Sequence, residues 1–189
     1  CVYALKSSQG GRARAFRYQF LFLGTAALFG AIFHAFFPLK DATTGGLVVW
    51  LLVCGSIAGT AYTMVHVMTE SLCEQPQRFV RRFFLVLLTF FLLVIIFHKR
   101  TYDVVLSFYA PVLVTYFCYA VYMLRKNTTW KLVALGLFLS ILAGVLQGSG
   151  FTVGILDHNT IYHLVQAAAL FVLLRGYQHV GGEIATTSS

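Results

Sequence analysis

The sequence contains very few charged residues: Asp, Glu, Lys and Arg together make up 11% of its 189 residues. A soluble globular domain carries about 25% charged and about 45–50% apolar residues. This chain is 59% hydrophobic, with a mean hydropathy of +0.79. The scarcity of charge therefore excludes an ordinary soluble domain and predicts a membrane protein. The net charge of +8 does not indicate nucleic-acid binding, because a basic interface of that kind needs a polar face that this chain lacks.

Proline is also scarce, and the cysteines form no motif. Three Pro and 16 Gly exclude a collagen-like or low-complexity chain. The four cysteines are scattered without a Cys-x-x-Cys pair, so they predict neither a disulfide framework nor a cysteine zinc site. The sequence has no phosphate loop, nucleophile elbow or His-Glu-x-x-His motif. An enzyme built from this chain would take its site residues from separate helices.

Long apolar runs dominate what is present. A helix needs about 20 mainly apolar residues to cross the roughly 30 Å hydrocarbon core of a bilayer. The runs are continuous rather than alternating, which favours helices over barrel strands. We predict an all-α, multi-pass transmembrane helix bundle forming a single domain over residues 1–189. Six spans are expected, at about 18–37, 45–68, 79–97, 104–124, 132–150 and 160–174.

Two kinds of residue inside these spans predict local features. Pro111 lies within the fourth span and is expected to bend or locally open that helix. The pairs Gly55/Gly59 and Gly144/Gly148 place small residues one helical turn apart, which permits close helix contact.

The basic residues predict the orientation. Eleven of the 14 Lys and Arg lie in the segments on the side of the N-terminus, and three lie on the other side. Because cytoplasmic loops carry the excess of Lys and Arg, both visible termini are expected in the cytoplasm. Residues 38–44, 98–103 and 151–159 are then outside. The bilayer is the predicted partner, since cations near anionic headgroups contribute about 1 kcal/mol each, although a topology signal alone also explains the basic loops.

Histidine and aspartate gather at the predicted outer leaflet. His34 and His163 lie within the first and last spans, and the other members lie at span ends or in the adjoining loops: Asp41, His98, Asp103, Asp157 and His158. Ionisable groups at membrane depth are costly and mark functional sites. Imidazole and carboxylate at one depth suit a zinc site with an activated water, able to hydrolyse an amide or ester of a lipid. The alternatives are interfacial positions for His98 and His158, and structural hydrogen bonds between helices for His34 and His163.

Three amides support the same region. Gln147 lies near the outer end of the fifth span. Gln166 shares a helix face with His163 and Asn159, so we expect this face to point inward. The remaining histidines, His66 and His179, lie on the inner side, and structural roles are expected for both.

The segments Gly30-Ala-Ile-Phe-His34 and Asn159-Thr-Ile-Tyr-His163 resemble the superfamily of alkaline ceramidases, adiponectin and progestin receptors and hemolysin III-like proteins. The resemblance implies a seven-helix bundle, three zinc-binding histidines and hydrolysis of a lipid amide. The six spans would be helices two to seven, and Val2–Leu5 the end of a preceding helix.

The resemblance also implies site residues. His34 corresponds to the second-helix histidine, and His163 to the last histidine of the His-x3-His motif. The family's serine falls on Gly30 and its first seventh-helix histidine on Asn159, which departs from the zinc motif. His158 and Asp41 are the candidates for the missing ligands, although His158 is turned about 100° around the helix from Asn159.

Two other function classes remain open. The chain fits a non-catalytic accessory or scaffold subunit of a larger membrane complex, since its 18 Phe and 10 Tyr suit lipid and protein contact alike. It also fits a b-type haem subunit, with His34 and His163 as axial ligands and Gly30 beside the ring. A transporter is disfavoured, because the Gly-rich break near 148–154 lies at a helix end rather than at mid-membrane.

Overall fold

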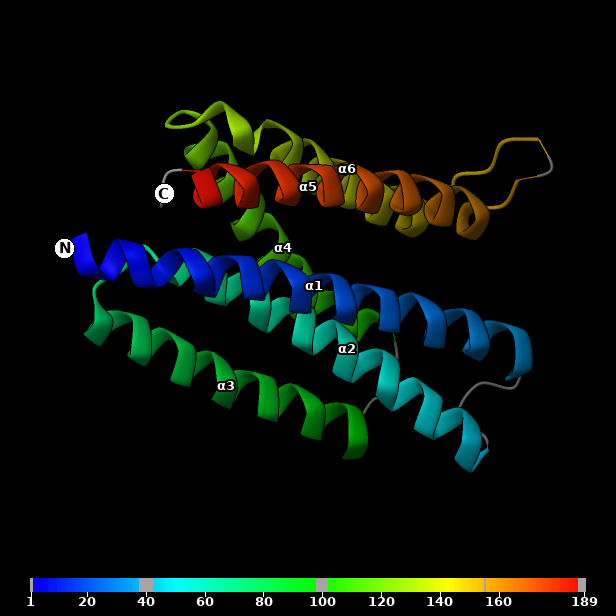
Figure 1. Ribbon diagram of the computed structural model, residues 1–189. Coiled ribbons are helices and arrows are strands. Elements are labelled where there is room, and N and C mark those ends of the chain that lie inside the picture. The colour runs from blue at the N-terminus through cyan, green and yellow to red at the C-terminus, as the bar shows by residue number, and fades with distance from the viewer. Residues whose placement is uncertain (1, 38–42, 98–101, 155, 187–189) are drawn as a thin grey trace. The chain divides into compact units, whose positions relative to one another are not determined.

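The computed structural model describes residues 2–37, 43–97, 102–154 and 156–186, and in these ranges the chain forms six α-helices and one 3₁₀ helix (Figure 1). The helices are α1 (Val2–Phe36), α2 (Thr44–Thr69), α3 (Glu74–Phe97), α4 (Tyr102–Leu124), η2 (Thr128–Trp130), α5 (Lys131–Ser149) and α6 (His158–Thr186). The described residues contain no β-strand beyond one isolated bridge between Val153 and Leu156. The predicted all-α class is confirmed.

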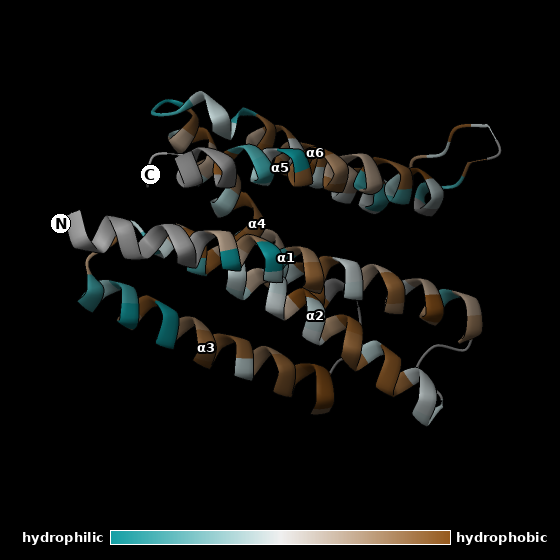
Figure 2. Cartoon of the chain, viewed as in Figure 1, coloured by the Kyte–Doolittle hydropathy of each residue, from teal (hydrophilic) through white to brown (hydrophobic). Residues whose placement is uncertain are grey.

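Five of these helices are long and apolar enough to cross a membrane. The described segments that meet both conditions are Ala13–Phe36, Thr44–Thr69, Glu74–Phe97, Val104–Leu124 and Thr128–Ser149. Figure 2 shows α3 turning from hydrophilic in its first turns to hydrophobic along the rest of its length. Length and composition therefore make the chain a multi-pass membrane protein. The predicted span at 160–174 lies within α6, which is not one of these five.

Two helices extend beyond their predicted spans. The basic stretch before Tyr18 was expected to be a loop, but α1 is helical from Val2 onward. Arg, Lys, Ala and Gln are good helix formers, so local propensity continues the helix outside the apolar run. Likewise α6 continues past Arg175 to Thr186. An apolar run marks where a helix crosses a membrane, not where the helix begins and ends.

Local signals fix several helix ends. Thr43 has an extended backbone, and its hydroxyl accepts a hydrogen bond from the Gly46 amide at 3.1 Å, which caps the start of α2. Gly150, with φ of 67°, ends α5 in the left-handed conformation that glycine adopts without a Cβ clash. Pro111 does not end the helix, because α4 remains helical on both sides of this residue.

The chain divides into two compact units within α4, one residue after Pro111. The first unit is Cys1–Val112 and the second is Leu113–Ser189. In the first unit, α1 packs antiparallel to α2, as shown by the Phe33 and Trp50 rings at 5.4 Å. One core cluster joins α2 to α3 and α4 through Cys54, Ala58, Phe91, Ile95 and Val105.

The second unit is built on close packing of α5 against α6. A Cβ added at Gly176 would lie 2.7 Å from the Val133 backbone nitrogen, and one at Gly136 would lie 2.5 Å from Leu173 Cγ. Backbones this close require glycine. Within the same unit, the hydroxyls of Tyr116 and Tyr177 share a buried hydrogen bond of 3.2 Å.

The glycine pairs that the sequence analysis singled out behave differently. An added Cβ at Gly55, Gly144 or Gly148 would meet nothing within 4 Å, whereas one at Gly59 would meet the Phe22 ring at 2.8 Å. The prediction of close contact is therefore correct for Gly59 and wrong for the other three. Spacing of one turn does not say which face of a helix receives a neighbour.

Candidate functional site

The two histidines at the centre of the predicted site are both exposed. His34 lies near the end of α1, with its ring centroid 6.0 Å from that of Phe33. His163 lies in the second turn of α6, 4.9 Å from the Tyr162 ring. Each imidazole thus lies on the surface of an apolar helix. They belong to different units, and each is described within its own unit.

The other predicted ligands are placed unevenly. Asp41 lies outside the described residues, as does His98. The side chains of Asp103 and Asn159 also lie outside the described part. His158 is half-buried at the start of α6.

Asp157 acts as the cap of α6. Its Oδ1 accepts a hydrogen bond from the Thr160 backbone amide at 2.7 Å. The hydrogen bond from the Thr160 side chain, followed by this backbone bond, lowers the pKa of Asp157 below its ordinary value of 3.8. The carboxylate of Asp157 therefore has a local structural task.

Of the supporting amides, Gln166 reaches a neighbouring helix. Its Nε2 donates to the Ser140 hydroxyl of α5 at 3.4 Å, so this part of the Gln166 face points toward α5. Gln147 is half-buried on α5. His163, one turn before Gln166, remains exposed although the face as a whole was expected to point inward.

The described residues do not complete a zinc site. Among them no group of three or more His, Cys, Asp or Glu side chains is arranged to hold a metal ion. A zinc site normally has at least three protein ligands. His34 and His163 have suitable chemistry and exposure, but they supply only two, one from each unit.

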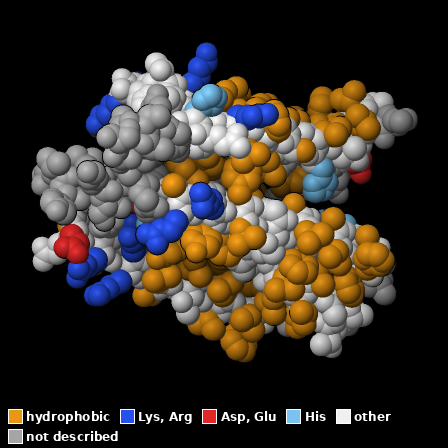
Figure 3. All heavy atoms as spheres, in the orientation of Figure 1, with side chains coloured by type: hydrophobic (Ala, Val, Ile, Leu, Met, Phe, Trp, Pro, Cys, Tyr) orange, Lys and Arg blue, Asp and Glu red, His pale blue; other side chains and the backbone are white. Residues whose placement is uncertain are grey.

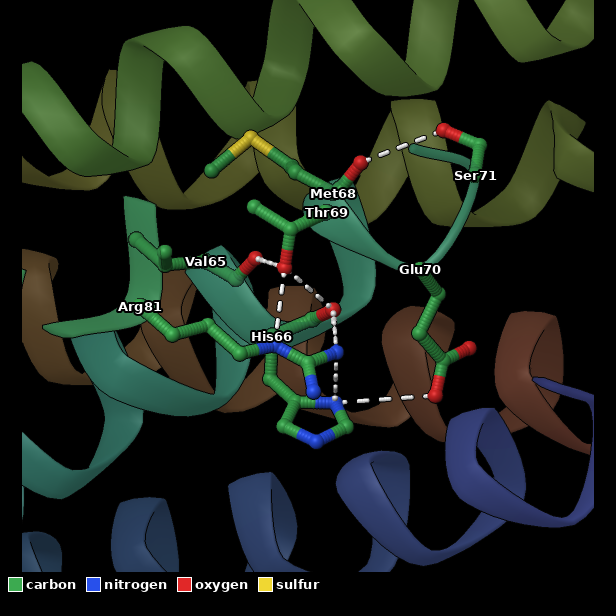
Figure 4. Close-up of polar contacts among 7 residues, drawn as sticks. All are labelled: Val65, His66, Met68, Thr69, Glu70, Ser71 and Arg81. Carbon is green, nitrogen blue, oxygen red and sulfur yellow. Dashed lines mark hydrogen bonds and ion pairs between the residues drawn. The ribbon is translucent and has the colours of Figure 1, made fainter. Parts of the chain in front are cut away.

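A different polar cluster lies in the first unit, where α2 ends and α3 begins (Figure 4). The Arg81 side chain of α3 reaches across to the last turn of α2. Its Nε donates to the Thr69 hydroxyl at 3.0 Å, and its Nη2 donates to the His66 carbonyl at 3.2 Å. Arg81 thereby satisfies carbonyl and hydroxyl groups at the end of a helix, where backbone acceptors lack partners.

The His66 ring stands between a donor and an acceptor. Its Nδ1 lies 3.3 Å from Arg81 Nη2 and 3.5 Å from Glu70 Oε1. The Glu70 side chain is only 3% exposed and the His66 side chain 28% exposed. The charge of Arg14, on α1, also acts on His66. Histidine, glutamate and arginine therefore meet where α2 ends beside α3, and the charge of Arg14 acts on them from α1.

The sequence alone predicted a structural role for His66 and did not reveal this cluster. The available signal was the spacing of four residues between His66 and Glu70, which places both on one helix face. Arg81 lies two turns into the next helix, and only the packing of α3 against α2 brings it back to His66.

This end of the unit also carries most of its described basic side chains. Arg14 and Arg17 of α1 and Arg82 of α3 are exposed, and Arg78 forms an ion pair with Glu74. Figure 3 shows basic side chains gathered at one end of α1 and α3 and hydrophobic side chains over the remaining length. Such separation is typical of a helix bundle with one end at the headgroups of a bilayer.

An all-α bundle with five membrane-length helices and a basic end defines an integral membrane protein of the multi-pass class. The chain belongs to DUF6962, a family of unknown function, whose model matches residues 1–181. No curated protein and no solved structure matches the chain.

Proposed function

We propose that the chain acts on a membrane lipid at the leaflet of His34 and His163, as the zinc-dependent lipid amide hydrolases that it resembles do. The observation that carries the proposal is the exposure of both imidazoles on apolar helices. An ionisable side chain in such a segment is costly and is retained for a function. His34 and His163 are also the two positions that match the histidines of the superfamily's motif.

The proposal assigns lipid contact to these two histidines and does not require that both bind the same metal ion. His158 and Asp41 are the further candidates for metal ligands. The hydrogen bond from Gln166 to Ser140 holds this part of α6 against α5. Zinc is thus part of the proposal as the cofactor that the resemblance implies.

The experiment is a hydrolysis assay on the purified protein in lipid nanodiscs that contain a fluorescent ceramide as the lipid amide. We expect hydrolysis by the wild type and its loss in His34→Ala and in His163→Ala. His179→Ala is the matched control, because His179 is an exposed histidine on the same helix as His163 but lies outside the predicted site. Equal turnover in all four proteins, or none in the wild type, contradicts the proposal.

A second candidate, a non-catalytic subunit of a membrane complex, is favoured by one surface of α3. Exposed apolar residues recur along it at alternating intervals of four and three residues: Phe79, Phe83, Val86, Phe90, Leu93 and Phe97. This is the seam spacing of helices that pack against one another. Native mass spectrometry of the protein released from its own membranes distinguishes the candidates. The mass of a single copy of the protein excludes a stable complex, and a larger stoichiometric mass that is lost in Phe83→Ala/Phe90→Ala supports one.

A further inference from the structure

Buried polar side chains run along one face of α2 toward the basic end of the first unit. Thr60 and Thr63 are buried, three residues apart, and His66 follows three residues later on the same face. Gln19 of α1 is fully buried as well. A polar row of this kind inside an apolar bundle is typical of a path for protons, ions or water.

The packing of α1 against α2 places Gln19 beside this row. Two contacts fix the antiparallel register: Phe22 lies against Gly59, and Phe33 lies against Trp50. One turn before Phe22, the same register puts Gln19 at the level of Thr63. Gln19 therefore lies on the helix that packs against α2, at the level of the buried Thr63 hydroxyl.

The hydrogen bonds of this row leave Gln19 without a partner. The Thr60 hydroxyl donates to the Ser56 carbonyl at 3.0 Å, and the Thr63 hydroxyl donates to the Thr60 carbonyl at 2.7 Å. Both hydroxyl protons are thus used, while the hydroxyl oxygens retain the capacity to accept. Neither Nε2 nor Oε1 of Gln19 has a hydrogen-bond partner among the described residues. A fully buried amide in this state is normally satisfied by internal water.

At the basic end of the row, the contacts of His66 are mutually exclusive. To accept from Arg81 Nη2, Nδ1 must hold a lone pair; to donate to Glu70 Oε1, it must hold a proton. One nitrogen cannot do both. The charged groups that face it are Glu70 from its own helix, Arg81 from α3 and Arg14 from α1.

We propose that Gln19, Thr60 and Thr63 hold internal water and that this water exchanges protons with His66, so that the basic end of the first unit is a proton-binding site. A proton that passes from a hydronium ion in this water to Nδ1 leaves a neutral water molecule, breaks the bond that Nδ1 accepts from Arg81 and forms the bond that it donates to Glu70. When the proton returns to water, the Arg81 bond forms again. The contact between α2 and α3 thereby changes with the proton, while the Arg81 bond to Thr69 persists.

The test is water-edited solid-state NMR of the wild-type protein in phosphatidylcholine bilayers. Magnetisation from water is expected to reach the Gln19 side-chain nitrogen as it reaches Gln178, which is exposed, and not to reach Ala61, which is fully buried on α2. The Gln19→Leu variant should lose the transfer to Thr63 and leave Ala61 unchanged. If no more magnetisation from water reaches Gln19 than reaches Ala61, the water site is overturned.

The proton site has its own readout in the ¹⁵N spectrum of His66. Between about pH 3 and 8, a window that extends well below the range in which an unperturbed histidine titrates, Nδ1 is expected to change from a protonated to an unprotonated nitrogen as the pH rises. Arg81→Met and Glu70→Gln should move the midpoint of that change in opposite directions, because the first removes a donor and the second removes a charged acceptor. A His66 Nδ1 signal that is constant with pH overturns the proton site. Both measurements are made on the folded wild type, so a variant that fails to fold does not leave the proposal undecided.

Discussion

Arg81 Nε donates a hydrogen bond of 3.0 Å to the Thr69 hydroxyl. This bond joins α3, two turns after its start, to the last turn of α2. Thr69 is buried, and its hydroxyl donates in turn to the Val65 carbonyl at 2.9 Å. The hydroxyl therefore acts as donor and acceptor at once. The pair therefore connects α2 and α3 close to residues 70–73, which link the two helices.

Replacing the Thr69 hydroxyl should destabilise the first unit. Thr69→Val keeps the shape of the side chain but leaves the Arg81 Nε hydrogen without this acceptor. Hydrogen bonds to charged groups contribute about 1.5–3 kcal/mol, so the free energy of unfolding in detergent should fall by an amount in that range. Thr89→Val is the control, since Thr89 is exposed and bonds only to its own helix at 2.9 Å; its effect should stay within about 0.5 kcal/mol. Equal effects of the two substitutions would show that the Arg81 contact adds nothing.

The geometry of the Arg81 guanidinium should matter as well as its charge. Arg81 donates from two different nitrogens, to Thr69 and to the His66 carbonyl, and a lysine ammonium cannot reproduce this fork. We expect Arg81→Lys to lower the midpoint of thermal unfolding and Arg82→Lys, at the exposed neighbouring position, to leave it unchanged. A midpoint that Arg81→Lys preserves would mean that charge alone is sufficient.

The close approach of α5 and α6 gives a prediction in the second unit. In Gly176→Ala the new Cβ would meet the Val133 backbone nitrogen at 2.7 Å, and a backbone cannot yield as a flexible side chain does. Overpacking of this kind costs about 1–3 kcal/mol. Gly144→Ala meets nothing within 4 Å and should stabilise α5 by about 1 kcal/mol through helix propensity. Thermal unfolding of both variants measures the difference, and destabilisation by Gly144→Ala would show a neighbour that the packing does not predict.

The cap of α6 should make stability depend on acid. The pKa of Asp157 is lower in the folded chain than the ordinary value of 3.8, because Thr160 donates to the charged carboxylate. A lowered pKa contributes stability above the unfolded value, and this contribution is lost as the pH falls through the folded value. Between about pH 5 and 3 the wild type should therefore lose more stability than Asp157→Asn, which can still accept the Thr160 hydrogen bond but carries no titrating charge. Parallel losses in the two proteins would contradict this role of Asp157.

The elements that depend on composition were predictable from the sequence, whereas the contacts between helices were not. Continuous apolar runs predicted the helices, since a helix that crosses a bilayer must satisfy its own backbone within an apolar segment. The helical start of α1 was missed because its basic residues form a helix without lengthening the apolar run.

The same distinction holds for individual residues at the contacts between helices. Gly136 and Gly176 were overlooked because their need for small side chains arises from the partner helix, not from their spacing. The contacts of His66 with Arg81 likewise depend on α3 folding back along α2. By contrast, the inward direction of Gln166 was predictable from its place on an apolar helix, and its side chain bonds to Ser140 of α5.

The most direct measurement for the proposed function is the metal content of the purified protein and of its histidine variants. A lipid hydrolase of the zinc-dependent kind should hold about one zinc ion per chain. We predict that at least one of His34→Ala and His163→Ala loses this zinc and that His179→Ala retains it. Less than about 0.2 zinc per chain in the wild type, unchanged by His34→Ala, would contradict a zinc-dependent role for these histidines.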